Sequence, residues 1–179
     1  MKMKKLIICL SIICSAVISI SAQFDNEGKL KVWTTGNVQR SYWQDFDDDD
    51  IAAALCKVRV AKHKGFDRIV FEFDDGKPQY VIQYLPSNMY PTEGGDREIK
   101  IAGDVFMVVN IYGMGMVEEM PCLLKTYPKK KLKFPSLVQI QHGVWFEGIR
   151  DFIIGVKGEK PFRVLELRNP SRLVIDFKH

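Results

Sequence analysis

The sequence has almost no net charge outside its first residues. Lys2, Lys4 and Lys5 fall within the first 22 residues, so 23 of the 26 basic residues remain against 22 acidic ones. A protein that binds nucleic acid through a general electrostatic surface needs a surplus of Lys and Arg to neutralise phosphates. We therefore expect no nucleic-acid partner.

Motifs of catalysis and metal binding are also missing. The chain has no Gly-x-Ser-x-Gly, no Cys-x-x-Cys and no His-Glu-x-x-His. Its three histidines, His63, His142 and His179, are far apart in sequence, so a zinc site would need a coincidence of folding. A glycosidase-like pair, such as Glu72 with Glu147, stays open as a minor alternative. We predict a protein without enzymatic activity, cofactor or metal.

Only one apolar stretch is long, and it lies near the N-terminus. Basic residues at Lys2–Lys5 precede the apolar run Leu6–Ile20, and small residues follow up to Ala22. This order predicts a signal peptide over residues 1–22, cleaved after Ala22. An uncleaved anchor is the alternative, although serines make the run shorter and more polar than a spanning helix. We expect an exported protein, periplasmic or extracellular, that does not span the membrane after cleavage.

Cysteine is scarce outside the leader. Cys9 and Cys14 belong to the predicted signal peptide, which leaves Cys56 and Cys122 as an even pair in an oxidising compartment. A disulfide between them is possible. The alternative is a buried thiol at Cys56, which shares its parity with Val58 and Val60.

The segment that follows the leader is acidic and has no sustained period. Aspartates and one glutamate dominate residues 23–53, and Asp47–Asp50 form a continuous run. This pattern predicts an acidic N-terminal tether, followed by one domain over residues 54–179. Trp33, Tyr42 and Trp43 are unusual in a linker, so part of this segment is free to pack onto the domain.

The rest of the chain lacks amphipathic helices of the length that parallel β-sheets need. Period-two alternation dominates instead, as in Cys56, Val58 and Val60 against Lys57 and Arg59. We predict an all-β fold, an antiparallel β-sandwich or open barrel of about nine strands. The expected strands are Cys56–Val60, Ile69–Phe73, Tyr80–Leu85, Glu98–Ile101, Val105–Tyr112, Leu137–His142, Arg150–Val156, Phe162–Leu167 and Leu173–Phe177.

Two connections are long for a β domain: Pro86–Arg97 and Gly113–Ser136. The second contains methionines and a lysine cluster, Lys125, Lys129, Lys130, Lys131 and Lys133. This cluster is either a patch for an anionic polymer or surface, or a solvated loop.

Several phrases of the sequence occur together in one known family. They are His63–Phe73, Phe146–Gly148, Gly155, Pro161–Val164 and Pro170–Asp176. In this order they resemble the AMIN-like domain of bacterial envelope proteins, over roughly Ala54–Phe177. The resemblance implies a β-sandwich that binds the cell wall or positions partners, without catalysis of its own.

The charged residues in these phrases have two interpretations. Asp67, Arg68, Glu72, Arg163, Arg172 and Asp176 can form cross-strand ion pairs that fix the register. The functional alternative is a ligand site in which Asp67, Arg68 and Glu147 hydrogen-bond a glycan or peptide stem. Aromatic side chains would then stack on sugar faces; the candidates are Tyr84, Tyr90, Tyr127 and Trp145.

These observations lead to one preferred function and one alternative. We expect an exported, non-catalytic cell-envelope module that binds peptidoglycan or another wall glycan. The alternative is a periplasmic protein–protein adaptor that uses edge strands and the Met-rich connection to bind envelope proteins.

Overall fold

The computed structural model describes most of the chain downstream of residue 31. The described residues are 32–40, 54–74, 76, 79–90, 97–112, 127–128, 131–146 and 148–179, with backbone alone at 97 and 144–146. Their regular elements are all β-strands. No helix among these residues has the length and apolar character needed to cross a membrane.

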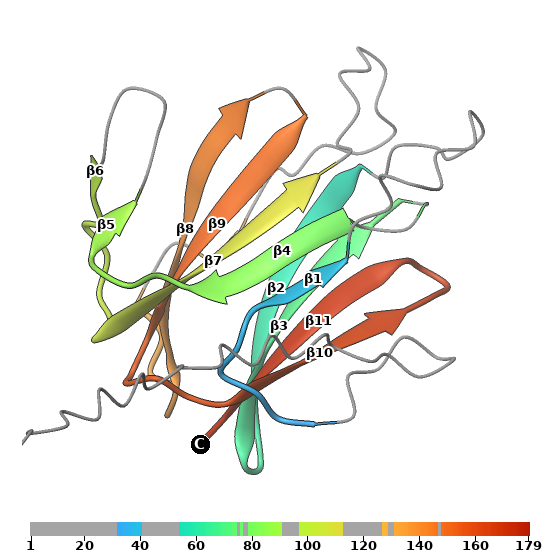
Figure 1. Ribbon diagram of the computed structural model, residues 1–179. Coiled ribbons are helices and arrows are strands. Elements are labelled where there is room, and N and C mark those ends of the chain that lie inside the picture. Colours follow the sequence, from blue (N-terminus) through green and yellow to red (C-terminus); the bar gives the residue numbers. More distant parts are fainter. Residues whose placement is uncertain are drawn as a thin grey trace, which may run out of the picture.

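Two antiparallel sheets form the fold (Figure 1). The five-stranded sheet has the order β1 (Val38–Arg40), β4 (Gln79–Tyr84), β7 (Val105–Tyr112), β9 (Ile149–Val156) and β8 (Leu137–Phe146). The four-stranded sheet has the order β10 (Phe162–Leu167), β11 (Arg172–Lys178), β3 (Phe66–Phe73) and β2 (Leu55–His63). The prediction of an all-β antiparallel fold is confirmed, and the arrangement is a β-sandwich.

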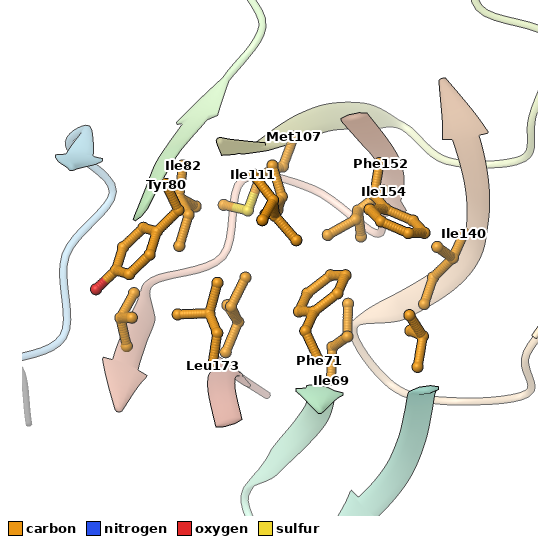
Figure 2. Close-up of a cluster of buried hydrophobic side chains, with 14 of the residues drawn as sticks. Ile69, Phe71, Tyr80, Ile82, Met107, Ile111, Ile140, Phe152, Ile154 and Leu173 are labelled. Atoms are coloured by element: carbon orange, nitrogen blue, oxygen red, sulfur yellow. The ribbon is translucent and has the colours of Figure 1, made fainter. Parts of the chain in front are cut away.

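The core lies between the two sheets because each strand buries alternate side chains. In β3 the residues Asp67, Ile69, Phe71 and Phe73 are buried, and the residues between them are half-buried. Figure 2 shows Ile69 and Phe71 facing Phe152 and Ile154 of the other sheet. Phe71 and Phe152 meet edge to face, with ring centroids 5.1 Å apart, a favoured geometry for aromatic pairs.

Residues 32–40, which we call the strap, join the two sheets at one side. Thr34 forms an isolated bridge with Phe162 at the start of β10, and Val38 pairs with Ile82 in β4. Arg40 forms an ion pair with Glu166, which also accepts a hydrogen bond of 2.8 Å from the Tyr80 hydroxyl. This part of the predicted tether therefore belongs to the sandwich. The tether residues 23–31 and 41–53 lie outside the described residues.

The described residues 86–90 and 97–104, which we call the arm, lie over the outer face of the five-stranded sheet. The arm contains the short pair β5 (Met89–Tyr90) and β6 (Arg97–Glu98). Its Tyr90 and Ile99 form a second apolar cluster with Phe106, Val108 and Ile153 of the sheet. The strand expected at Glu98–Ile101 is thus replaced by β6 and a covering segment. The two main sheets still contain nine described strands, because the strap supplies β1.

Cys56 on β2 is disulfide-bonded. Cys122 lies outside the described residues, and the pairing of these two cysteines stays a prediction.

Candidate functional site

The outer face of the four-stranded sheet carries a cluster of arginine and aromatic side chains near the β2–β3 hairpin. Alternation in β3 turns Phe66 and Arg68 outward, since Asp67 and Ile69 are buried. The register places Asp176 of β11 opposite Arg68, and Arg163 of β10 opposite Asp176. We call this cluster the arginine–aromatic patch; it comprises Trp33, His63, Phe66, Arg68, Arg163 and Asp176.

One buried carboxylate holds both arginines of the patch. Asp176 is 0% exposed and accepts hydrogen bonds from Arg68 Nε at 2.6 Å and Arg68 Nη2 at 2.9 Å. It also accepts a hydrogen bond of 2.9 Å from Arg163 Nε. The arginine side chains stay partly exposed, at 26% for Arg68 and 33% for Arg163. Charge-assisted pairs of this kind fix the planes of the guanidinium groups.

Aromatic rings flank these guanidinium groups. The Arg163 Cζ lies 4.7 Å from the ring centroid of Trp33 and 5.3 Å from that of Phe66. The Arg68 Cζ lies 5.2 Å from the Phe66 ring, and His63 stacks on Phe66 at 4.7 Å between centroids. Cations within about 6 Å of a ring centroid are attracted to its face. The patch is therefore a set of oriented donors beside half-exposed rings.

This arrangement leaves hydrogen-bond donors available to a ligand. Within the described part of the chain, Arg163 uses Nε for Asp176, and neither of its terminal nitrogens has a protein acceptor. A ligand with hydroxyl or carboxylate oxygens and an apolar ring face matches such a surface, because the donors and rings are adjacent.

Asp67, a predicted ligand residue, lies on the opposite face of the same strand. It is 0% exposed, and its Oδ2 accepts from the backbone N–H groups of Ser136 at 2.7 Å and Leu137 at 3.0 Å. Its Oδ1 lies 3.0 Å from His179 Nε2. These contacts tie β3 to the start of β8 and to the last residue.

The predicted tyrosines occupy three separate places. The Tyr84 hydroxyl donates to the Lys160 carbonyl at 2.7 Å, and burial raises the pKa of Tyr84 to about 12. Tyr90 belongs to the arm, and its hydroxyl donates to Asp151 of β9, which also accepts from Asn110 Nδ2 at 2.6 Å. Burial, followed by the bond to Asp151, raises the pKa of Tyr90.

Tyr127 packs against the main core beside His142 and Phe152. Burial, followed by the charge of Arg150, lowers the pKa of His142 and favours its neutral form. Trp145 lies in β8, where only its backbone is described, and Glu147 lies outside the described residues. The fold therefore does not gather the described members of the predicted set, and Arg68 is the one that lies in the patch.

Five patch residues were not predicted as ligand residues: Trp33, His63, Phe66, Arg163 and Asp176. The cross-strand ion pairs predicted for Arg68, Arg163 and Asp176 are confirmed. Their aromatic neighbours were less evident, although Phe66 shares its parity with Arg68. No local signal places Trp33 beside Arg163, because the two are brought together by the bridge between Thr34 and Phe162.

Among the described residues, no group of three or more His, Cys, Asp or Glu side chains is placed to hold a metal ion.

The fold and the patch define a β-sandwich module with a polar and aromatic outer face. The AMIN-like domain family matches residues 53–179, and the chain belongs to this family. The resemblance inferred from the sequence phrases is thus confirmed. No curated protein matches the chain. Family membership makes it a cell-envelope module of the AMIN type.

Proposed function

We propose that the protein is an exported, non-catalytic module that binds peptidoglycan or another wall glycan through the arginine–aromatic patch. The observation that carries this proposal is the position of Arg163, which lies between Trp33 and Phe66 while Asp176 holds its Nε.

The chemistry of the patch matches that of a wall glycan. Sugar rings present apolar C–H faces that stack on aromatic side chains, and their hydroxyls accept hydrogen bonds. Peptidoglycan also carries carboxylates on its peptide stems, and the planar guanidinium fork suits carboxylates. Phe66 and Trp33 would supply the ring faces, and Arg68 and Arg163 the donors.

Preorganisation supports binding by this surface. A flexible arginine loses rotamer entropy when it binds a ligand, and this loss weakens binding. Asp176 already holds both side chains in the unbound protein, so less entropy remains to be lost. The export of the module rests on the predicted signal peptide, and its lack of catalysis rests on the absence of catalytic motifs from the sequence.

The test is co-sedimentation of residues 23–179 with insoluble peptidoglycan, with released muropeptides assayed in the same tubes. We expect saturable pelleting without release. Arg163→Gln should weaken binding about tenfold or more, because a hydrogen bond to a charged group contributes about 1.5–3 kcal/mol. Trp33→Ala should also weaken it.

The matched control is Arg59→Gln. Arg59 is an exposed arginine on the same face, paired with Glu72 and opposite Val70, four residues along β3 from Phe66. The Arg59→Gln variant should bind peptidoglycan as tightly as the unchanged protein does. Equal loss in both arginine variants would contradict a role for the patch, and absence of pelleting by folded protein would overturn glycan binding.

The adaptor alternative would use the edge of a sheet. In the described part of the chain, β2 is an outer strand of the four-stranded sheet. It has a register shift between Leu55 and Lys57, and Lys57, Arg59 and Lys62 are exposed along it. Bulges and charges are features that discourage strand addition. The β2 edge is therefore poorly suited to adaptor binding by strand addition.

A further inference from the structure

We propose that one end of the sandwich binds the surface of an anionic phospholipid membrane. This end, which we call the basic end, presents six exposed lysines: Lys62, Lys64, Lys131, Lys133, Lys157 and Lys178. The basic end adjoins the arginine–aromatic patch, since Lys178 pairs with Phe66, but the proposal does not require that the patch binds a glycan.

Backbone contacts gather the segments that carry these lysines. The His179 N–H donates to Gly65 in the β2–β3 hairpin at 3.0 Å, and Lys157 N–H donates to Ser136 at 2.9 Å. The Ser136 hydroxyl donates to the Lys178 carbonyl at 2.8 Å. The hairpin, the segment before β8, the turn after β9 and the last residues therefore meet at one end, where Figure 1 shows the C-terminus beside the β2–β3 hairpin.

The charge at this end is strongly unbalanced. Asp104 and Glu159 are the exposed carboxylates described in the neighbouring turns. Asp67 and Asp176 also lie near this end, but both are buried and bound to protein groups. Six exposed lysine side chains thus face two exposed carboxylate side chains, in a chain that is nearly neutral after its leader.

The type and spread of the charges favour a membrane surface over a small ligand. Lysine is a flexible point charge, whereas pockets for small anions usually present arginine forks or backbone N–H groups. Here the lysines project from four separate segments around the end of the sandwich. A layer of phosphate headgroups can neutralise such a set, since each Lys near an anionic surface contributes about 1 kcal/mol.

The path of the chain points to the same partner. The strap begins at this end, because Thr34 bridges to Phe162 next to the basic turn after β9. Only residues 21–31 separate Val32 from the apolar run that ends at Ile20. Eleven residues span at most about 40 Å, so the predicted leader would keep this end close to the membrane before cleavage after Ala22.

The test measures how tightly a protein of residues 23–179 binds to phospholipid vesicles. Phosphatidylglycerol–phosphatidylcholine vesicles are compared with vesicles of phosphatidylcholine alone, at low and high salt. We expect binding to the anionic vesicles that salt weakens. Lys131→Gln combined with Lys157→Gln, two exposed lysines of the basic end beside the five-stranded sheet, should weaken it about 30-fold.

The matched control is Lys57→Gln combined with Lys100→Gln, which removes two exposed lysines from outside the basic end. It should retain most of the binding. No binding to anionic vesicles at low salt, or equal loss in both double variants, would overturn the proposal. Trp33→Ala should keep vesicle binding, which separates this proposal from the glycan proposal.

Discussion

Two buried carboxylates, Asp67 and Asp176, accept hydrogen bonds on opposite faces of the four-stranded sheet. Asp67 points inward and binds backbone N–H groups at the start of β8, while Asp176 points outward and binds two arginines. A buried carboxylate needs such partners because its desolvation is otherwise costly. One side chain therefore joins the sheets, and the other organises the candidate binding surface.

At the residue scale we predict that Asp176→Asn both destabilises the protein and weakens glycan binding. The amide cannot balance two guanidinium charges, so the free energy of unfolding should fall by about 1–3 kcal/mol. Urea unfolding measures this change, and co-sedimentation with peptidoglycan measures the loss of binding expected when Asp176 no longer orients Arg68 and Arg163.

Glu72→Gln is the control for Asp176→Asn, since it breaks an ion pair with the exposed Arg59 on the same face. Exposed pairs contribute about 0–1 kcal/mol, so this variant should change stability less. Similar losses in the two variants would contradict the central role of Asp176.

Among the elements, the arm depends on a close approach at Gly155. A Cβ atom at this glycine would lie 1.9 Å from the Ala102 carbonyl oxygen, which belongs to the arm. The Ala102 N–H also donates to Gln139 of β8 at 3.0 Å, and Tyr90 binds Asp151. The arm therefore stays against the sheet only while β9 has no side chain at this position.

For this element we predict that Gly155→Ala displaces the arm and lowers the free energy of unfolding by about 1–3 kcal/mol, the usual cost of overpacking. Amide hydrogen exchange should show lower protection at Ile99, whose N–H donates to Asn88 within the arm. Gly36→Ala is the control, because the nearest atom to its added Cβ is Thr34 Oγ1 at 3.4 Å. Unchanged exchange in Gly155→Ala would contradict this dependence.

At the scale of the whole molecule, the strap connects the two sheets. It lies outside the residues matched by the family. It contacts the four-stranded sheet at Phe162 and the five-stranded sheet at Ile82. It also brings Trp33 to Arg163. The strap therefore closes one side of the sandwich and completes the patch.

At this scale we predict unequal effects of the same substitution at two strap positions. Val38 is 1% exposed and belongs to the main core, whereas Val32 is 58% exposed. Val38→Ala should lower the free energy of unfolding by about 2 kcal/mol, because it removes buried methyl groups and leaves a cavity. Val32→Ala should change it by less than about 0.5 kcal/mol. Urea unfolding curves test both, and equal midpoints would show that the strap adds little to stability.

The sequence alone determined the fold class, because alternation is a local property of each strand. Ile69, Phe71 and Phe73 share one parity and turn inward together, whatever the neighbouring strand is. The phrases around His63–Phe73 and Pro170–Asp176 likewise sufficed to recognise the family. Arg68 was identified as a candidate ligand residue from the same local pattern.

Only the tertiary structure decided which side chains meet. Asp67 and Arg68 are adjacent in sequence but lie on opposite faces of β3, so they cannot share a surface site. Trp33 and Arg163 are remote in sequence and come together through an isolated bridge. The lysines of the basic end are gathered in the same way, by pairing between distant segments. Such pairing depends on sheet order and register, which the period of a single strand does not encode.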